Sequence, residues 1–149
     1  MEVAGRVEAV CVGARTGARK RPVESITLVA DLGVAGDAHA GSGRQVSLLA
    51  TESLDKLRAK GLQVGPGDLA ENITTSGVEL PTLAVGTALR IGGALLEVTQ
   101  IGKECHAPCA IARQAGECVM PTEGIFARVK AGGEVRAGDE ITALADGEG

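Results

Sequence analysis

A thiol, an imidazole and an ammonium group gather in one short stretch of the sequence, VTQIGKECHAPCAIAR, at residues 98–113. Its apolar first part predicts the end of a strand. Its alanine-rich second part predicts a helix or helical turn, with Pro108 tolerated in the first turn. Cys105 would then lie where the strand gives way to the helix, two residues from Lys103. Helix N–H groups and a nearby cation both favour the thiolate, so we expect the pKa of Cys105 to lie below about 8.5.

The alternative for Cys105 is structural, because free cysteines are often small buried hydrophobes. The residues alone leave both interpretations open. Cys11 lies in an apolar segment and is expected to be a core residue that stays protonated. A disulfide between Cys105 and Cys109 would require a distorted turn, since side chains four apart on a helix are about 5 to 6 Å apart.

A zinc site is the metal alternative for this region. Four side chains there would suffice for tetrahedral zinc: Cys105, His106, Cys109 and Cys118. Their spacing lacks the paired C-x-x-C pattern of zinc ribbons and fingers, which disfavours zinc.

Two glycine-rich loops carry further polar groups that could bind a ligand. The first, GARTGARKRP, places Lys20 in a run of four cations, which predicts either a solvated turn or a site for a phosphate or an acidic partner. The second, at residues 31–45, presents Asp37, His39 and Arg44 among small residues, where backbone can approach a ligand closely. Its structural alternative is a set of glycine turns capped by Asp37.

Composition limits the classes of function. The 149 residues fit one globular domain, with 44% hydrophobic and 23% charged residues. One Phe, no Trp and no Tyr leave no aromatic surface on which bases could stack, and the net charge of -4 also argues against nucleic-acid binding. The sequence has no apolar run long enough to span a membrane and no signal-peptide pattern, so we expect a soluble cytoplasmic protein.

Short apolar segments separated by glycine predict an all-β, barrel-like fold. We expect strands at residues 3–12, 25–30 and 46–49, and more after residue 65, but no regular element at residues 31–45. In the first strand, alternation places Val7, Ala9 and Cys11 on one face.

One clear helix is expected at residues 52–60, and a second short one after Cys105. Thr51 would cap the first helix and Gly61 would end it, with Leu54 and Leu57 toward the core. Asn72 precedes the strand-like ITT. Its amide would either satisfy nearby backbone or offer a donor and an acceptor to a polar ligand.

Several segments together resemble the MOSC domain family, named for the C-terminal domain of molybdenum cofactor sulfurases, in its small stand-alone bacterial form. They occur in order over nearly the whole chain: GDAHAG with RQVSLL, GDLAENITTSG, LRIGGALLEVTQIGKECHAPC and GIFARVKAGGEVRAGDEI. The resemblance implies a single β-barrel domain over residues 1–149 and a role with the molybdenum-pterin cofactor or with sulfur bound for a metal centre. The family's cysteine follows the glutamine of a TQ pair by five residues, which here gives Gln100 and Cys105.

Two functions follow from this resemblance. In the first, Cys105 is a sulfur carrier with sulfurtransferase-type activity. It would accept sulfur from a separate cysteine desulfurase, which alone would hold pyridoxal phosphate, and would deliver it to a molybdenum cofactor, a molybdoenzyme or another acceptor. In the second, the domain binds the cofactor and Cys105 ligates molybdenum directly. The extra cysteines, Cys109 and Cys118, slightly favour the first function, sulfur relay, over the second.

A pterin phosphate bound by an acidic protein needs a local positive field. We therefore expect five cations to converge around Cys105: Arg19, Lys20, Arg44, Lys103 and Arg128. The predicted cofactor-binding residues are Lys20, His39, Arg44, Asn72, Lys103 and Arg128. The alternative is that these side chains are scattered over the surface.

Overall fold

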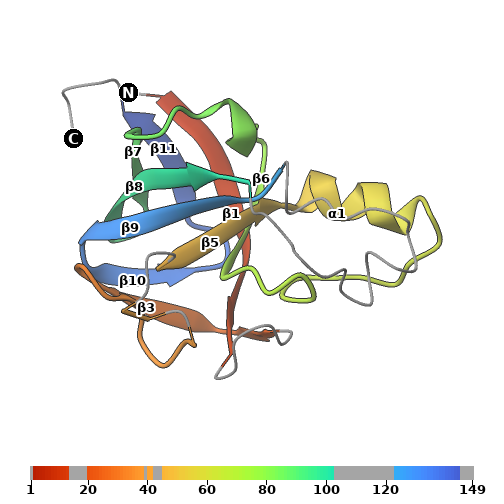
Figure 1. Cartoon of the computed structure of the whole chain (residues 1–149), viewed down its shortest axis with the longest axis horizontal. Coiled ribbons are helices and arrows are strands. Elements are labelled where there is room, and N and C mark those ends of the chain that lie inside the picture. Colours follow the sequence, from red (N-terminus) through yellow and green to blue (C-terminus); the bar gives the residue numbers. More distant parts are fainter. Residues whose placement is uncertain (1, 14–19, 39, 42–44, 103–122, 145–149) are drawn as a thin grey trace.

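A closed β-barrel with one α-helix beside it makes up the fold (Figure 1), as seen in a computed structural model that describes residues 2–13, 20–38, 40–41, 45–102 and 123–144. The elements in chain order are β1 (Glu2–Val12), β2 (Arg21–Val23), β3 (Ser25–Val29), β4 (Gly33–Val34), β5 (Val46–Ala50), α1 (Thr51–Arg58), β6 (Ile73–Ser76), the 3₁₀ helix η1 (Leu80–Thr82), β7 (Ala88–Ile91), β8 (Ala94–Ile101), β9 (Ile125–Ala131), β10 (Gly133–Arg136) and β11 (Glu140–Leu144). The predicted β-rich barrel is confirmed.

The barrel contains seven strands in the order β11-β7-β8-β9-β5-β6-β1, and it closes because β1 also pairs with β11. The β5–β6 pair is parallel and the other pairs in the ring are antiparallel, so the barrel is mixed. Strand β2 extends β1 outside the ring, and β10, β3 and β4 form a second, three-stranded sheet. Closure leaves no open edge within the ring.

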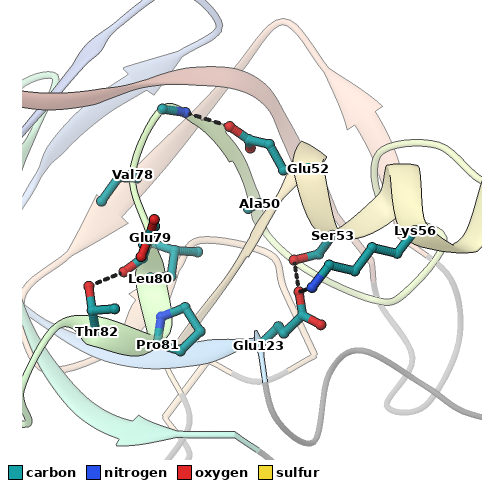
Figure 2. Close-up of a pocket in the computed structure, with 11 residues that line it drawn as sticks. Ala50, Glu52, Ser53, Lys56, Val78, Glu79, Leu80, Pro81, Thr82 and Glu123 are labelled. Atoms are coloured by element: carbon teal, nitrogen blue, oxygen red, sulfur yellow. Dashed lines mark hydrogen bonds and ion pairs between the residues drawn. The ribbon is translucent and has the colours of Figure 1, made fainter.

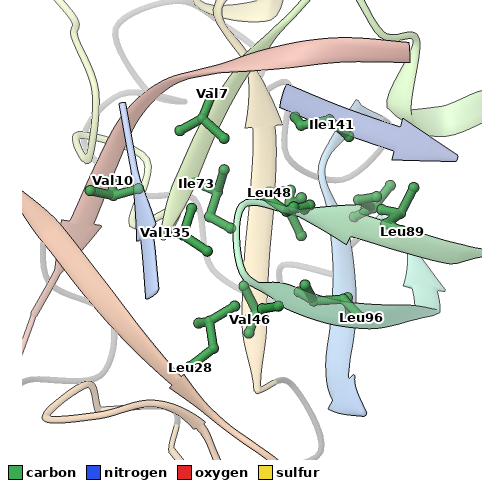
Figure 3. Close-up of a cluster of buried hydrophobic side chains, with 14 of the residues drawn as sticks. Val7, Val10, Leu28, Val46, Leu48, Ile73, Leu89, Leu96, Val135 and Ile141 are labelled. Atoms are coloured by element: carbon green, nitrogen blue, oxygen red, sulfur yellow. The ribbon is translucent and has the colours of Figure 1, made fainter. Parts of the chain in front are cut away.

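Aliphatic side chains fill the barrel (Figure 3), as the scarcity of aromatic residues requires. They come from strands far apart in the sequence, such as Val7 of β1, Leu48 of β5 and Ile141 of β11, all at most 1% exposed. A second apolar cluster packs α1 against the other face of the sheet through Leu54, Leu57 and Phe126. The two clusters follow from the alternation of strand residues, in which Ile125 and Ala127 join the first and Phe126 joins the second.

The predicted face of β1 is wrong beyond Val7. The pairing of β1 with β6 shifts register between Val7 and Ala9, so that Val7 and Val10 both belong to the barrel core. A bulge adds one residue to one strand and thereby inverts the alternation after it. Cys11 is buried as predicted.

The helix is confirmed at Thr51–Arg58, with Leu54 and Leu57 buried, but its predicted cap is wrong. Ala50 occupies the N-cap position and no side chain caps the helix, because β5 runs into α1 without an intervening loop. The last helical residue is Arg58, and Gly61 terminates the helix as predicted. Its φ is 90°, its N–H donates to the Arg58 carbonyl oxygen at 2.9 Å, and the N–H of Leu62 donates to the Leu57 carbonyl oxygen at 3.3 Å. In the stretch expected to be irregular, Gly33–Val34 forms the short strand β4 against β3.

No helix among the described residues is long and apolar enough to cross a membrane. The second predicted helix, after Cys105, lies outside the described residues.

Candidate functional site

Lys20 and Asp37 form a buried ion pair. The distance from Lys20 Nζ to Asp37 Oδ1 is 2.7 Å, and both side chains are 0% exposed. Asp37 Oδ1 also accepts a hydrogen bond of 3.0 Å from the backbone N–H of Gly13. A solvated turn is therefore the wrong description of Lys20. Asp37 also satisfies a backbone N–H group 24 residues away, that of Gly13.

Gly67 brings a second loop against this ion pair. The backbone N–H of Lys20 donates to the carbonyl oxygen of Gly67 at 2.8 Å. Gly67 has a φ of 87°, and a Cβ atom there would collide with the Lys20 carbonyl oxygen and press on Cys11 Sγ. Only glycine permits both this backbone conformation and this close approach.

Asn72 joins three segments of the barrel through its side chain. Its Oδ1 accepts hydrogen bonds from the backbone N–H of Ser47 at 3.1 Å and from Ser47 Oγ at 3.2 Å, and its Nδ2 donates to the Cys11 carbonyl oxygen at 3.2 Å. Asn72 is fully buried, so the partners of its amide are protein groups from β5 and β1. These partners lie 25 and 61 residues away in the sequence, so the Asn72 side chain does not cap its own turn but bonds to distant segments.

Cys11 stays protonated at neutral pH, as predicted. Burial, together with the charges of Glu71 and Asp68, raises the pKa of its thiol to about 12, and Lys20 opposes this rise. Cys11 therefore cannot be the reactive thiol at neutral pH.

Glu71 is a buried acid that the sequence did not single out as a site residue. Its side chain is 0% exposed, and its Oε2 accepts a hydrogen bond of 2.9 Å from Thr74 Oγ1. Its Oε1 has no hydrogen-bond partner among the described residues. Burial raises the pKa of Glu71, against the opposing effect of backbone N–H groups, including that of Gly67, and of the Thr74 hydroxyl. The sequence carried no signal for this, because a Glu in a glycine-rich loop usually faces water.

Arg128 lies in a different place from Lys20. On β9 it has the opposite orientation to the barrel-core residues Ala127 and Val129, and its side chain is 43% exposed. Its Nε donates to Glu97 Oε1 at 2.6 Å, and its guanidinium lies 3.3 Å from Asp31 Oδ1. The hydrogen bond from Arg128 lowers the pKa of Glu97, and that bond raises the pKa of Arg128.

The structure therefore brings two of the predicted site residues together. Lys20 and Asn72 both border Cys11, whereas Arg128 has its own carboxylate partners. The remaining predicted site residues fall outside the described residues: His39, Arg44, Lys103 and Cys105, as do Arg19, His106, Cys109 and Cys118.

Strands β8 and β9 remain paired up to the segment that carries Cys105. The backbone N–H of Gly102 donates to the Gly124 carbonyl oxygen at 2.7 Å, and Gln100 Nε2 donates to the Gly102 carbonyl oxygen at 2.9 Å. Gly102 and Gly124, which lie on either side of this segment in the sequence, are therefore adjacent at one end of the barrel.

The MOSC domain family model matches residues 35–142, and the chain belongs to this family. Membership places it in a molybdenum-cofactor-related context. The same fold occurs in YuaD from Bacillus subtilis, with a TM-score of 0.73 and 20% identity over 92% of this chain and 93% of that one. It also occurs in YiiM from Escherichia coli, with a TM-score of 0.65 and 22% identity over 94% of this chain and 70% of that one. YiiM from Geobacillus stearothermophilus has a TM-score of 0.66 and 18% identity over 99% of this chain and 77% of that one. A comparison with curated proteins gave no match.

Proposed function

We propose that this domain is a sulfur carrier that accepts sulfur on Cys105 from a separate cysteine desulfurase and delivers it to a molybdenum cofactor or another acceptor. The observation that supports this most directly is the family match over residues 35–142, a range that contains Cys105. The partners implied are a desulfurase, which holds the pyridoxal phosphate, and a molybdoenzyme or its cofactor.

The transfer needs no external oxidant. The Cys105 thiolate attacks the terminal sulfur of a persulfide on the donor, the donor's S–S bond breaks, and the donor cysteine leaves as a thiolate. Cys105 then carries the persulfide. A nucleophilic acceptor attacks the outer sulfur, the S–S bond breaks, and Cys105 leaves as a thiolate. The first step requires a thiolate at neutral pH, and Cys11, with its pKa of about 12, cannot supply one.

Chain connectivity restricts where this chemistry can occur. Three peptide units separate Cys105 from Gly102, so its Cα atom lies within about 11 Å of the Gly102 Cα atom. A donor must therefore reach the end of the barrel at which β8 ends and β9 begins.

The described residues do not by themselves fit a pterin phosphate. Lys20 is neutralised by Asp37, Arg128 lies between two carboxylates, and the amide of Asn72 is used by Ser47 and Cys11. The unpartnered oxygen of this region belongs to Glu71, an acid, which would not stabilise an anion. The proposal therefore rests on sulfur transfer at Cys105 and includes no step on a bound cofactor.

Incubation with a cysteine desulfurase and cysteine tests the proposal. We expect one added sulfur on the peptide containing Cys105, seen by mass spectrometry, and loss of this addition in Cys105→Ser. The matched controls are Cys109→Ser and Cys118→Ser, which should still take up sulfur. Limiting alkylation near pH 7 should label Cys105 first and Cys11 last.

Uptake of sulfur by Cys105→Ser would contradict the carrier assignment. Molybdenum that copurifies with the protein and is lost in Cys105→Ser, without any sulfur uptake, would instead establish the cofactor-binding function with Cys105 as the metal ligand.

A further inference from the structure

A cleft of about 650 Å³ opens between the start of α1, the segment around η1 and the start of β9. Figure 2 shows the stretch from Val78 to Thr82 along one wall and the side chains of α1 along the other, with Glu123 at the base of the view. This volume is in the range of ligand pockets, which run from about 300 to 1,000 Å³.

The floor of the cleft is apolar because it is the end of the barrel core. Ala50, Val78 and Leu80 line the cleft and also belong to the core cluster, at most 8% exposed. Thr75 pairs in register with Ala50 across the parallel β5–β6 ladder, so its buried side chain lies beside that of Ala50. Its Oγ1 has no hydrogen-bond partner among the described residues. An aliphatic group could therefore be buried on this floor, with one hydroxyl close behind it.

The rim of the cleft is acidic. Among the described residues, it carries the three carboxylates of Glu52, Glu79 and Glu123 against one ammonium group, that of Lys56. Glu52 Oε2 accepts a hydrogen bond of 2.9 Å from the backbone N–H of Gly77. Glu123 Oε1 accepts two, from Ser53 Oγ at 2.6 Å and from Lys56 Nζ at 3.0 Å.

The protein's own contacts leave part of this charge unused. The bonds to Glu52 and Glu123 each occupy one carboxylate oxygen, and the carboxylate of Glu79 has no ion pair among the described residues. Lys56 is 63% exposed, so it neutralises only part of the acidic rim. The complementary ligand is a cation attached to an aliphatic group.

We propose that this cleft docks a short basic segment of another polypeptide, with a Lys or Arg side chain against the rim and an aliphatic side chain on the floor. Carboxylates stand on both walls and the floor between them is apolar, an arrangement that suits an extended chain with both kinds of side chain. Glu123 lies just before β9, at the same end of the barrel as Gly102, so a docked partner would sit at the end where β8 ends and β9 begins. The docking is independent of the proposed sulfur transfer, and a direct binding measurement tests it.

The chain itself offers a clean assay because it contains no Trp and no Tyr. A blocked peptide Gly-Leu-Lys-Leu-Trp-Gly can be titrated with the full-length protein, and its Trp emission reports binding without background from the protein. The matched peptide has Glu in place of Lys. We expect saturable binding of the Lys peptide, weakened by salt, and no binding of the Glu peptide.

Three single substitutions of surface charges should change the affinity for the Lys peptide in different directions. Glu79→Gln should weaken binding of the Lys peptide, and Lys56→Gln should strengthen it, each by about two- to fivefold as expected for exposed ion pairs. Glu24→Gln removes the same charge as Glu79→Gln at an exposed position outside the cleft and should leave binding unchanged. Circular dichroism confirms that each variant is folded.

Equal binding of the Lys and Glu peptides would overturn the proposal, and so would weaker binding by Lys56→Gln. Butylamine that displaces the peptide at the peptide's own concentration would show a small-molecule amine site in place of a docking site. Failure of sulfur uptake by Cys105 would leave these expectations unchanged, so the two proposals fail separately.

Discussion

Lys20 and Asp37 are held together where water does not reach them, so each depends on the other for charge compensation. Removal of one member of a buried ion pair leaves the other charged in a medium that solvates it poorly. We expect Asp37→Asn to lower the free energy of unfolding by about 3 to 5 kcal/mol, measured by urea unfolding followed by circular dichroism.

The matched control for Asp37→Asn is the exposed pair of Asp55 and Arg58 on α1, at 2.7 Å. Solvent screens that pair, so Asp55→Asn should cost at most about 0.5 kcal/mol. Equal losses from the two substitutions would show that the Lys20 and Asp37 pair contributes no more than a surface contact.

Glu71 makes stability depend on pH in the opposite sense from an ion-paired acid. Because burial raises its pKa, the folded protein holds the proton at pH values where the unfolded chain has lost it. Stability linked to Glu71 is therefore fully present below the unfolded pKa of about 4.3 and declines as pH rises toward the folded pKa.

Glu71→Gln should remove this decline, since the amide does not titrate. The difference in unfolding free energy between Glu71→Gln and the parent protein should shift in favour of the variant as pH rises from 4 toward neutrality. Urea unfolding at several pH values gives this difference, in which the other titrating groups cancel. A difference that does not change with pH would show that Glu71 ionises normally in the folded state.

At the scale of elements, the sequence predicted what depends on local patterns. Alternation and glycine spacing placed β5, β6 and β8, and the apolar pair Leu54 and Leu57 identified the helix and its buried face. The predictions failed where a distant segment decides. The bulge in β1 is fixed by its pairing with β6, and the missing cap at Thr51 follows from the direct junction of β5 and α1.

The candidate site was less predictable than the elements for the same reason. The burial of Lys20 results from Asp37 and from the loop around Gly67, neither adjacent in sequence, and the partners of Asn72 lie on two other strands. The side-chain types indicated that these residues could do chemistry. Only the fold determines whether water or protein surrounds them.

The contact between Gly67 and Lys20 links an irregular loop to the barrel. Gly67→Ala should therefore cost more stability than the same change at Gly61, which has a similar φ of 90° but no atom near the position of a Cβ. Gly61→Ala should lower stability by about 1 to 2 kcal/mol, because an L-residue with a Cβ atom is disfavoured in the left-handed backbone conformation. Gly67→Ala adds a backbone collision to that cost. Thermal unfolding of the two variants gives their losses of stability. Similar losses would mean that the loop moves away from Lys20 without cost.

At the scale of the whole molecule, closure of the barrel makes the two ends of the chain part of one unit. Strand β1 pairs with β11, so the core contains side chains from both the first and the last strand. By contrast, within the described part of the chain β2 pairs only with β1, at the end of the sheet order, and β4 pairs only with β3. We therefore expect backbone amides of the seven barrel strands to exchange with deuterium only through global unfolding, and those of β2 and β4 to exchange faster.

Ile141→Ala provides the decisive test of this cooperativity. Ile141 is fully buried in β11 between β1 and β7, and removal of its side chain should cost about 2 to 5 kcal/mol. If the barrel unfolds as one unit, exchange should accelerate by at least about 25-fold in all seven strands, including β5 and β9 on the other side of the ring. Val85→Ala, at a position that is 63% exposed, should leave exchange unchanged. Acceleration confined to β11 and its two neighbours would mean that the barrel opens locally at its closure, and the chain ends would then be a separate, less stable unit.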